Sequence, residues 1–376
     1  MINLKVIDLF CGCGGISAGF KNQGFQVVLG ADINPFALKT FRRNFPKAMA
    51  VETDLSSVDP KELLHALELK PGELDCLVGG PPCQGFSKNV PARHRYQGDP
   101  RNKLLLTYIE FVRVFKPKFV LIENVAEMMK AFEESYSEEI IESLEGFGYK
   151  VKSERLLAAN YGVPQLRRRA FFFANRVGVP VTVPAAHRLA PKERPGLFTK
   201  ELPHGYVNVW DAIGDLPSLE SGEGDSPCKY AKEPGSDYQR LMRTKSTTVC
   251  DHVARKLSDP QLERVKHLRP GMGEGVDALP KHLRPRSGYS GAYARLIPDE
   301  PARTITRWVF HPGSGRFYHP YDDRVITIRE AARLQSFPDW FAFDGTYIQK
   351  SHQVGEAVPP LLAQAFAVEI AKTLAV

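Results

Sequence analysis

The chain has 376 residues, about twice the length of a usual domain, so one large and one smaller domain are expected. Apolar residues make up 43% and charged residues 25%, a globular composition that excludes a disordered chain. Six cysteines are too few for a disulfide framework at this length, and no apolar run reaches the roughly 18 residues of a membrane span. The N-terminus leads straight into a strand pattern without a signal-peptide layout, so a reducing cytoplasm is expected.

The first half of the chain alternates apolar runs with helix signals, which indicates an α/β domain with a parallel sheet. Strands are expected at residues 6–10, 27–31, 76–78, 119–123 and 171–175. Each run ends at a Gly, Asp, Glu or Asn, which we expect at the carboxyl edge of the sheet. Helices are expected from Asn34-Pro35, from Asp59-Pro60, and over residues 103–116.

After about Asn175 the strand and helix rhythm stops, and prolines interrupt the pattern until regular structure returns near Val325. A last helix is expected over residues 360–374. We therefore predict one domain from residues 1–185 plus 350–376, with a second domain, residues 186–349, inserted into it.

The inserted region carries the positive charge of the chain. Between Cys228 and Arg307, sixteen Lys and Arg stand against nine Asp and Glu, an excess equal to the net charge of +7 of the whole chain. A basic stretch is most often a solvated surface, but it also suits a polyanion such as nucleic acid.

A glycine-rich turn follows the first strand, in Asp8-Leu9-Phe10-Cys11-Gly12-Cys13-Gly14-Gly15. Glycines let the backbone turn sharply and approach a ligand closely. A nicotinamide dinucleotide fingerprint would need a glycine at Ser17, so that cofactor is disfavoured. Asp32 and Asp54 follow the next two elements. Each alone is best read as a turn cap, but together with the glycine turn they favour a cofactor that contains adenosine.

The segment Gly79-Gly80-Pro81-Pro82-Cys83 places a thiol where a sheet of this kind binds ligands. A lone cysteine is usually an inert apolar residue, but the two prolines fix this one in place, so we favour a nucleophile. Glu123 ends the next strand, where a partly buried carboxylate could hold or donate a proton. Arg167 and Arg169 precede a further strand and could orient that carboxylate or a substrate, whereas Arg168 is read as solvated.

These blocks resemble the DNA (cytosine-5)-methyltransferase family of the bacterial restriction-modification type. The matching blocks occur in the family's order, and they are Asp8-Leu9-Phe10 to Gly15, Pro81-Pro82-Cys83-Gln84, Glu123-Asn124-Val125, Gln165-x-Arg167-x-Arg169, the block from Thr327 to Pro338, and Gly355-Glu356-Ala357-Val358-Pro359-Pro360. The resemblance implies a Rossmann-like, S-adenosylmethionine-dependent methyltransferase sheet with an inserted, smaller target-recognition domain.

The resemblance also implies a mechanism, in which a cytosine is flipped out of double-stranded DNA and methylated at C5. Cys83 would add to C6 of the base, and Glu123 would bond N3 and the exocyclic amine. Arg169 would contact the base carbonyl, and Arg167 would support Glu123. Arg333 and Glu330, in the block before Pro338, are read as an internal ion pair of the scaffold.

The same resemblance assigns the cofactor, S-adenosylmethionine, to a set of residues near the two turns and the last block. These are Phe10, Gly12, Gly14, Gly15, Asp32, Ile33, Asp54, Leu55, Pro82, Leu104, Glu356 and Ala357. Two of them depart from the family pattern. Asp32 stands where a glutamate is usual, and Glu356 stands where an asparagine is usual. No metal site is expected.

The DNA contacts implied by the resemblance lie in a loop after Cys83 and in the inserted region. They are Ser87, Lys88, Asn89, Arg93, Arg95, Arg284, Arg286, Arg295, Arg303 and Arg307. The expected partner is double-stranded DNA, with a functional pairing to a restriction endonuclease, no membrane and a monomeric state. Two alternatives stay open, namely a tRNA cytosine-5 methyltransferase, whose Cys-Phe-Thr signature is missing here, and a catalytically inactive DNA-binding homologue.

Overall fold

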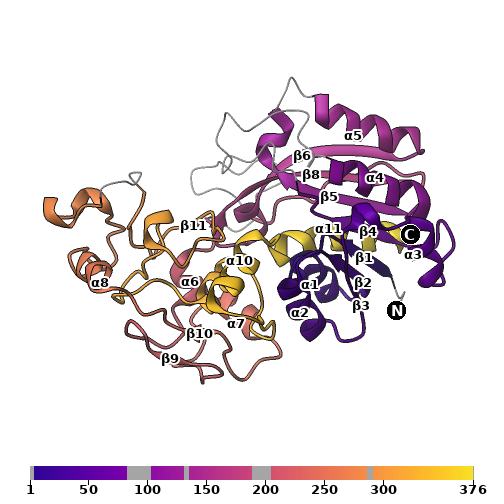
Figure 1. Ribbon diagram of the computed structural model, residues 1–376. Coiled ribbons are helices and arrows are strands. Elements are labelled where there is room, and N and C mark those ends of the chain that lie inside the picture. Colours follow the sequence, from indigo (N-terminus) through magenta and orange to yellow (C-terminus); the bar gives the residue numbers. More distant parts are fainter. Residues whose placement is uncertain (1–3, 83–102, 131–134, 189–204, 286–290, 376) are drawn as a thin grey trace. The chain divides into compact units, whose positions relative to one another are not determined.

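The structure is a computed structural model, which describes residues 4–82, 103–130, 135–188, 205–285 and 291–375. The chain forms two compact units (Figure 1). The first unit comprises residues 1–157, 168–186 and 358–376, and the second comprises residues 158–167 and 187–357. Residues 158–167 and 350–357 therefore group with the second unit.

A seven-stranded sheet with flanking helices makes up the first unit. Its elements are β1 (Lys5–Leu9), α1 (Gly15–Asn22), β2 (Gln26–Asp32), α2 (Pro35–Asn44), β3 (Met49–Glu52), α3 (Pro60–Ala66), β4 (Cys76–Gly79), α4 (Lys103–Phe115), β5 (Phe119–Val125), α5 (Ser135–Gly146), β6 (Lys150–Leu157), β8 (Arg168–Asn175) and α11 (Pro360–Leu374). The strand order is β3-β2-β1-β4-β5-β8-β6. The predicted α/β sheet is confirmed.

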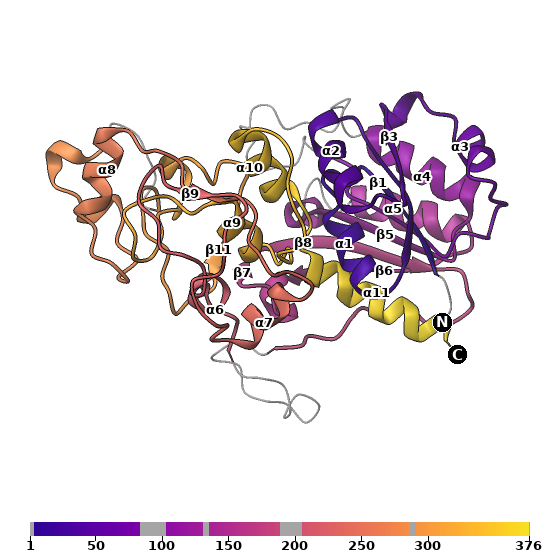
Figure 2. The ribbon, with the colours of Figure 1, turned by 90° about the horizontal axis from the view of Figure 1, so that it is seen from below.

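Four helices of the first unit, α2, α3, α4 and α11, begin where the sequence predicted them, whereas α5 was not predicted. The Asn34 side chain accepts hydrogen bonds from the Phe36 and Ala37 backbone N–H groups, and it caps α2. The Asp59 carboxylate accepts from the Lys61 N–H at 2.8 Å and caps α3. In Figure 1, α4 and α5 lie on the opposite side of the sheet from α1 and α11. Seen from below, α11 runs beside α1, against which it packs (Figure 2).

One strand runs against the prediction. β1, β2, β3, β4 and β5 are parallel, but β8 is antiparallel to β5 and to β6. Asn175 therefore ends its strand at the opposite edge of the sheet, and the expectation that it lies at the carboxyl edge was wrong. The start of β8 takes that place instead, because Arg169 stands opposite Val125 at the end of β5.

The second unit contains short elements joined by irregular chain. They are β7 (Gln165–Leu166), α6 (Val209–Ile213), β9 (Gly224–Asp225), α7 (Asp237–Arg243), β10 (His252–Val253), α8 (Asp259–Lys266), β11 (Ala302–Arg303), α9 (Ile328–Leu334) and α10 (Tyr347–Glu356). β9 pairs with β10, and β11 pairs with β7. One of its apolar clusters comprises Leu257, Val265, Leu268, Leu279, Leu283, Tyr318 and Val325.

Buried arginines connect the irregular segments of the second unit. Arg167, Arg295, Arg324, Arg329 and Arg333 are among its largest fully buried side chains. Each donates to backbone carbonyls of segments distant in sequence, as when Arg329 reaches the carbonyls of Cys250 and Phe341 at 2.8 and 2.6 Å. Five fork-shaped donors of this kind can tie irregular chain together without regular strands.

Candidate active site

The turn between β1 and α1 depends on glycine. Phe10, Gly12 and Gly14 all have positive φ angles, of 58°, 53° and 95°. A Cβ on Gly14 would lie 2.5 Å from the Phe45 ring, so a larger residue would both strain the backbone and clash. A Cβ on Gly12 would meet no atom within 4 Å, which leaves room above the turn.

Asp32, at the end of β2, braces this turn. Its two carboxylate oxygens accept hydrogen bonds from the backbone N–H groups of Gly12 and Asn34, both at 2.8 Å. Burial raises the pKa of Asp32 above its ordinary value. Ile33 follows with 66% of its surface exposed. The carboxylate thus holds the glycine turn against the second strand.

The remaining expected cofactor residues of the first unit lie on neighbouring elements. Asp54 is exposed and caps the short 3-10 helix Leu55–Ser57, and hydrogen bonds from Ser56 lower its pKa. Leu55 is buried, and Leu104 is partly buried in the first turn of α4. The capping role that sequence alone favoured for Asp54 is present, and it leaves one carboxylate oxygen, Oδ2, without a described hydrogen bond.

Asp8 was not among the predicted site residues, although it opens the first matching block. The side chain is completely buried, and its Oδ2 accepts from the Ser17 N–H and hydroxyl at 3.2 and 2.7 Å. Its Oδ1 is buried without a hydrogen-bond partner among the described residues. Burial raises the pKa of Asp8 to about 7. A titratable group therefore lies directly before the glycine turn.

The turn that leads to Cys83 is held from β5. A Cβ on Gly79 would lie 2.3 Å from the Leu9 carbonyl oxygen, so β4 and β1 approach too closely for a side chain there. The Asn124 amide Nδ2 donates to the Pro81 carbonyl at 3.0 Å. Cys83 itself, with the predicted contacts Ser87, Lys88, Asn89, Arg93 and Arg95, lies outside the described residues.

Glu123 and Arg169 form an ion pair at the edge where β5 ends. The Arg169 Nε lies 2.9 Å from the Glu123 Oε1, and the two side chains are 18% and 12% exposed. A Cβ on Gly80 would lie 3.3 Å from the Glu123 Oε2, so the carboxylate faces the backbone that continues to Pro81 and Pro82. This arrangement brings a carboxylate and a guanidinium to the edge of the sheet where the described chain continues to Pro82, the residue before Cys83.

The two arginines of the Gln165-x-Arg167-x-Arg169 block belong to different units. The chain passes from the second unit into the first between Arg167 and Arg168. Sequence reasoning gave the support of Glu123 to Arg167, but the ion pair in the structure is made by Arg169. Arg167 is 2% exposed, and its Nη1 donates to the carbonyls of Ile305 and Gly355 at 3.1 and 3.2 Å.

The predicted DNA contacts of the second unit have different surroundings. Arg303 and Arg307 are exposed, and the Arg307 Nη1 lies 3.5 Å from the Glu356 Oε1. Arg284 is exposed but donates to the carbonyls of Leu279 and Asp277. Arg286 lies outside the described residues.

Arg295 requires a correction, because the structure buries it. It is 1% exposed, and its guanidinium donates to the carbonyls of Val265, Leu268, His319 and Asp322 and pairs with Asp323. Because all three guanidinium nitrogens of Arg295 already have partners, this side chain stabilises the fold and has no donor left for DNA.

Glu330 and Arg333 do form internal ion pairs, but each has other partners. Burial would raise the pKa of Glu330, yet the Arg324 guanidinium at 2.8 Å holds that pKa well below its ordinary value. Arg333 pairs with Asp215 and Asp339 at 2.5 and 2.7 Å. The expected scaffold is therefore a set of separate buried pairs and not one bond between these two residues.

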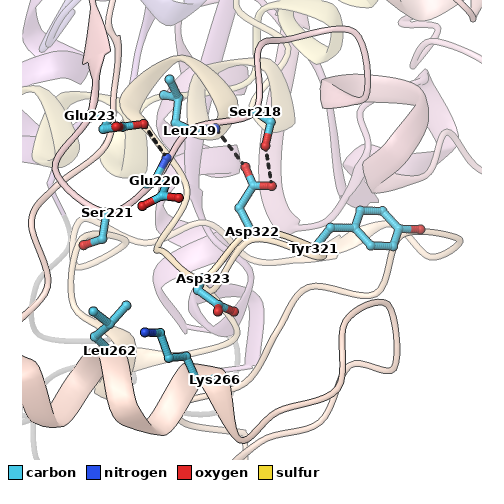
Figure 3. Close-up of a pocket in the computed structure, with 10 residues that line it drawn as sticks. All are labelled: Ser218, Leu219, Glu220, Ser221, Glu223, Leu262, Lys266, Tyr321, Asp322 and Asp323. Carbon is cyan, nitrogen blue, oxygen red and sulfur yellow. Dashed lines mark hydrogen bonds between the residues drawn. The ribbon is translucent and has the colours of Figure 1, made fainter.

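A cavity of about 420 Å³ opens in the second unit (Figure 3). Its lining includes Glu220, Glu223, Asp322 and Asp323, with Lys266 as the basic residue. The Asp322 carboxylate accepts from the Ser218 hydroxyl at 2.8 Å and from the Leu219 N–H at 3.2 Å, as drawn in Figure 3. Acidic side chains repel a polyanion, so we assign no DNA contact to this cavity.

The described ranges contain no cluster of metal ligands and no single membrane-spanning helix. No group of three or more His, Cys, Asp or Glu side chains in these ranges could hold a metal ion. No single helix there is long and apolar enough to cross a membrane, and α10 and α11 reach that length only together, across a break.

The sheet order, the glycine turn held by Asp32 and the Glu123–Arg169 ion pair define an α/β fold with polar groups at the carboxyl edge of its parallel strands. The chain belongs to the C-5 cytosine-specific DNA methylase family, whose model matches residues 4–372. It is therefore a methyltransferase, and it uses a methyl donor.

Individual relatives agree with this assignment. The chain is 33% identical to the type II methyltransferase M.AgeI of Thalassovita gelatinovora, over 97% of this chain and 98% of that protein. It is 35% identical to M1.HphI of Haemophilus parahaemolyticus, over 99% and 87% of the two chains. A solved prophage-encoded DNA modification methyltransferase from E. coli superposes with a TM-score of 0.78 at 27% identity over the whole of both chains. A methyltransferase of S. pombe, with a TM-score of 0.61 and 17% identity over both whole chains, shares the fold.

Proposed function

We propose that this enzyme methylates C5 of a cytosine within a specific double-stranded DNA sequence, with S-adenosylmethionine as methyl donor. The observation that carries the proposal is the Glu123–Arg169 ion pair, whose carboxylate lies next to Gly80 in the segment that leads to Pro81 and Pro82. A paired carboxylate and guanidinium can bond the polar edge of a pyrimidine, while a thiol attacks the ring. DNA is favoured over tRNA because M.AgeI and M1.HphI, which the chain matches over nearly its whole length, are type II methyltransferases and because the family model is that of a DNA methylase.

The residues of the first unit fit the proposed cofactor. The open turn at Gly12 gives backbone close approach, Asp32 and Asp54 supply carboxylate acceptors, and Ile33 offers an exposed apolar surface. Phe10, Gly14, Gly15, Leu55, Pro82 and Leu104 complete this proposed set, and Glu356 and Ala357 of the second unit are included from the family pattern. When bound, S-adenosylmethionine supplies an electrophilic methyl group.

Cys83 provides the nucleophile in this proposal. Its thiolate adds to C6 of a cytosine flipped out of the duplex, and the new S–C6 bond shifts electron density onto C5. C5 can then accept a methyl group. Water then takes the C5 proton, and the electron pair of the C5–H bond forms the C5–C6 double bond while the S–C6 bond breaks. This step restores the aromatic ring and releases the thiolate.

Glu123 and Arg169 stabilise the changing base. Glu123 bonds N3 and the exocyclic amine, where the ring gains electron density when the thiolate adds. Arg169 fixes the orientation of Glu123 and lies next to the position proposed for the base carbonyl. Because both side chains are largely buried, their hydrogen bonds are stronger than they would be in water.

We assign the second unit to target recognition, with Arg303 and Arg307 as DNA contacts and Arg284 and Arg286 as further candidates. We further propose that the enzyme is monomeric and cytoplasmic and that it protects DNA from a cognate restriction endonuclease. The type II names of the relatives support the protective role.

One experiment tests the reaction and identifies the target. Mixed-sequence duplex DNA is incubated with the full chain and S-adenosylmethionine, and 5-methylcytosine is mapped at single-base resolution. Methylation confined to one sequence is expected. Methylation of tRNA with none of DNA would refute the substrate. A duplex with 5-fluorocytosine at the mapped position should form a covalent complex with the wild type and none with Cys83→Ala, because fluorine cannot leave as the proton does.

A further inference from the structure

A short segment of the second unit, residues 303–308, exposes three side chains suited to nucleic acid. Arg303 is exposed, the Arg307 side chain is 48% exposed, and Trp308 is 44% exposed. The Arg307 guanidinium lies 5.1 Å from the centre of the Trp308 ring, within the range of a cation–π contact. An exposed aromatic face next to guanidinium groups can pack on sugar or base while the cations meet phosphates.

The Trp308 ring packs against two other aromatic rings. Its centre lies 5.7 Å from that of Phe310 and 5.4 Å from that of His352. The Trp308 carbonyl accepts from the Ser314 hydroxyl at 2.6 Å. A ring that is already packed against its neighbours, on a backbone fixed by a hydrogen bond, loses little conformational freedom when it binds a partner.

The backbone of the 303–308 segment is fixed by Gln165 and Arg167. β11 pairs with β7, and the Ile305 N–H donates to the Gln165 Oε1 at 2.8 Å. The buried Arg167 guanidinium donates to the carbonyls of both Ile305 and Gly355. The Arg167 side chain thus links the 303–308 segment to the end of α10.

Gly355 completes this junction by its lack of a side chain. A Cβ there would lie 2.2 Å from the Arg307 nitrogen and 2.2 Å from the Thr306 carbonyl carbon. The Ser351 hydroxyl donates to the Arg307 carbonyl at 3.0 Å. Any larger residue at position 355 must therefore push the backbone of the segment away.

Arg307 forms a long, solvent-exposed ion pair with Glu356. Glu356 lies 3.5 Å away, and its side chain is 54% exposed. An exposed ion pair of this length contributes little free energy, so Arg307 can exchange the carboxylate for a phosphate.

We propose that Arg303, Arg307 and Trp308 bind duplex DNA as one rigid element, and that Arg167 is a positioning residue for this element. The proposal rests on the proposed function, because it takes DNA as the partner. It adds Trp308 as a DNA contact and moves Arg167 from the chemistry of the base to the placement of the DNA.

Fluorescence anisotropy tests the element. It measures how tightly the full chain binds a fluorescein-labelled, mixed-sequence duplex over a range of salt concentrations. Trp308→Ala should weaken binding roughly tenfold, and Trp308→Phe should retain most of the affinity. Arg303→Gln and Arg307→Gln should each reduce the salt slope by about 0.9. Wild-type affinity and salt slope in all of these variants would overturn the proposal.

Arg167→Gln and Gly355→Ala test the positioning role. The control for the first is Arg168→Gln, which changes an exposed arginine, and the control for the second is Gly146→Ala, where an added Cβ meets no atom within 4 Å. Both test variants should weaken duplex binding roughly tenfold, while methyl transfer in a single turnover at saturating DNA stays within about twofold of wild type. A slowed turnover with unchanged affinity would instead place Arg167 in the chemistry and overturn the proposal.

Two readouts keep the test decisive. If Arg167→Gln shows no cooperative thermal unfolding, Gly355→Ala decides, because it keeps Arg167 and removes no hydrogen-bonding group. If that variant folds and binds like wild type, the proposal is wrong. If the wild type methylates no DNA, the proposed function fails, whereas the binding series still reports on the 303–308 element by itself.

Discussion

Substituting Glu123 by glutamine separates two contributions of one side chain. Glutamine keeps the shape and one acceptor oxygen but removes the charge and the ability to hold a proton. A hydrogen bond to a charged group contributes roughly 1.5–3 kcal/mol, so loss of the ion pair with Arg169 alone would slow the reaction about 10- to 100-fold. Positioned proton transfer adds about 10²- to 10⁴-fold. Since both are lost, we expect methyl transfer to slow by about a thousandfold or more.

The assay is a single turnover at saturating DNA and methyl donor, which removes binding from the measured rate. Arg168→Gln serves as the control, because it changes a neighbouring exposed arginine. The double variant Glu123→Gln with Arg169→Gln should cost less than the sum of the two single variants, since the pair is shared. A rate for Glu123→Gln within threefold of wild type would refute this reasoning.

Three further results are expected. Cys83→Ala should abolish methyl transfer but leave duplex binding, and measurable turnover would contradict the thiol mechanism. Gly14→Ala should lower the free energy of unfolding by a few kcal/mol and weaken binding of S-adenosylmethionine, because the added Cβ would lie 2.5 Å from Phe45 on a left-handed backbone. Calorimetry measures the stability and equilibrium dialysis measures the binding, with Gly146→Ala as the control. Burial lowers the pKa of His319 to about 4, so the folded protein holds this side chain neutral. The free energy of unfolding should therefore fall by up to roughly 3 kcal/mol as the pH drops from about 6.5 to 4. A thermal-unfolding series in which His319→Asn shows the same fall would contradict this cause.

The strands that line the site could be predicted because they are buried on both faces. Apolar runs marked β1, β2, β4 and β5 within a few residues, but β3 and β6 gave no such signal. Both are edge strands with largely exposed side chains, so their sequences look like loops. The direction of β8 was also missed, because an apolar run is the same whichever way the strand enters the sheet.

The arginines show a different limit of sequence reasoning. Arg295 and Arg303 stand in the same basic stretch, yet one is buried and the other exposed. The difference comes from backbone carbonyls of distant segments that converge on Arg295, and sequence alone does not show where those acceptors meet. In the same way, the alternation in Gln165-x-Arg167-x-Arg169 predicted a shared role, whereas the chain changes unit within it.

The interrupted course of the first unit has a consequence for its synthesis. α11 follows the whole second unit in the chain, yet it packs against α1, and a Cβ on Gly19 of α1 would lie only 2.3 Å from the Pro360 carbonyl oxygen. A ribosome releases the chain from its N-terminus, so the glycine turn and its helix must wait, with one face uncovered, until about 180 further residues after β8 have emerged. We therefore expect the nascent first unit to be the part of the polypeptide that most needs protection from aggregation.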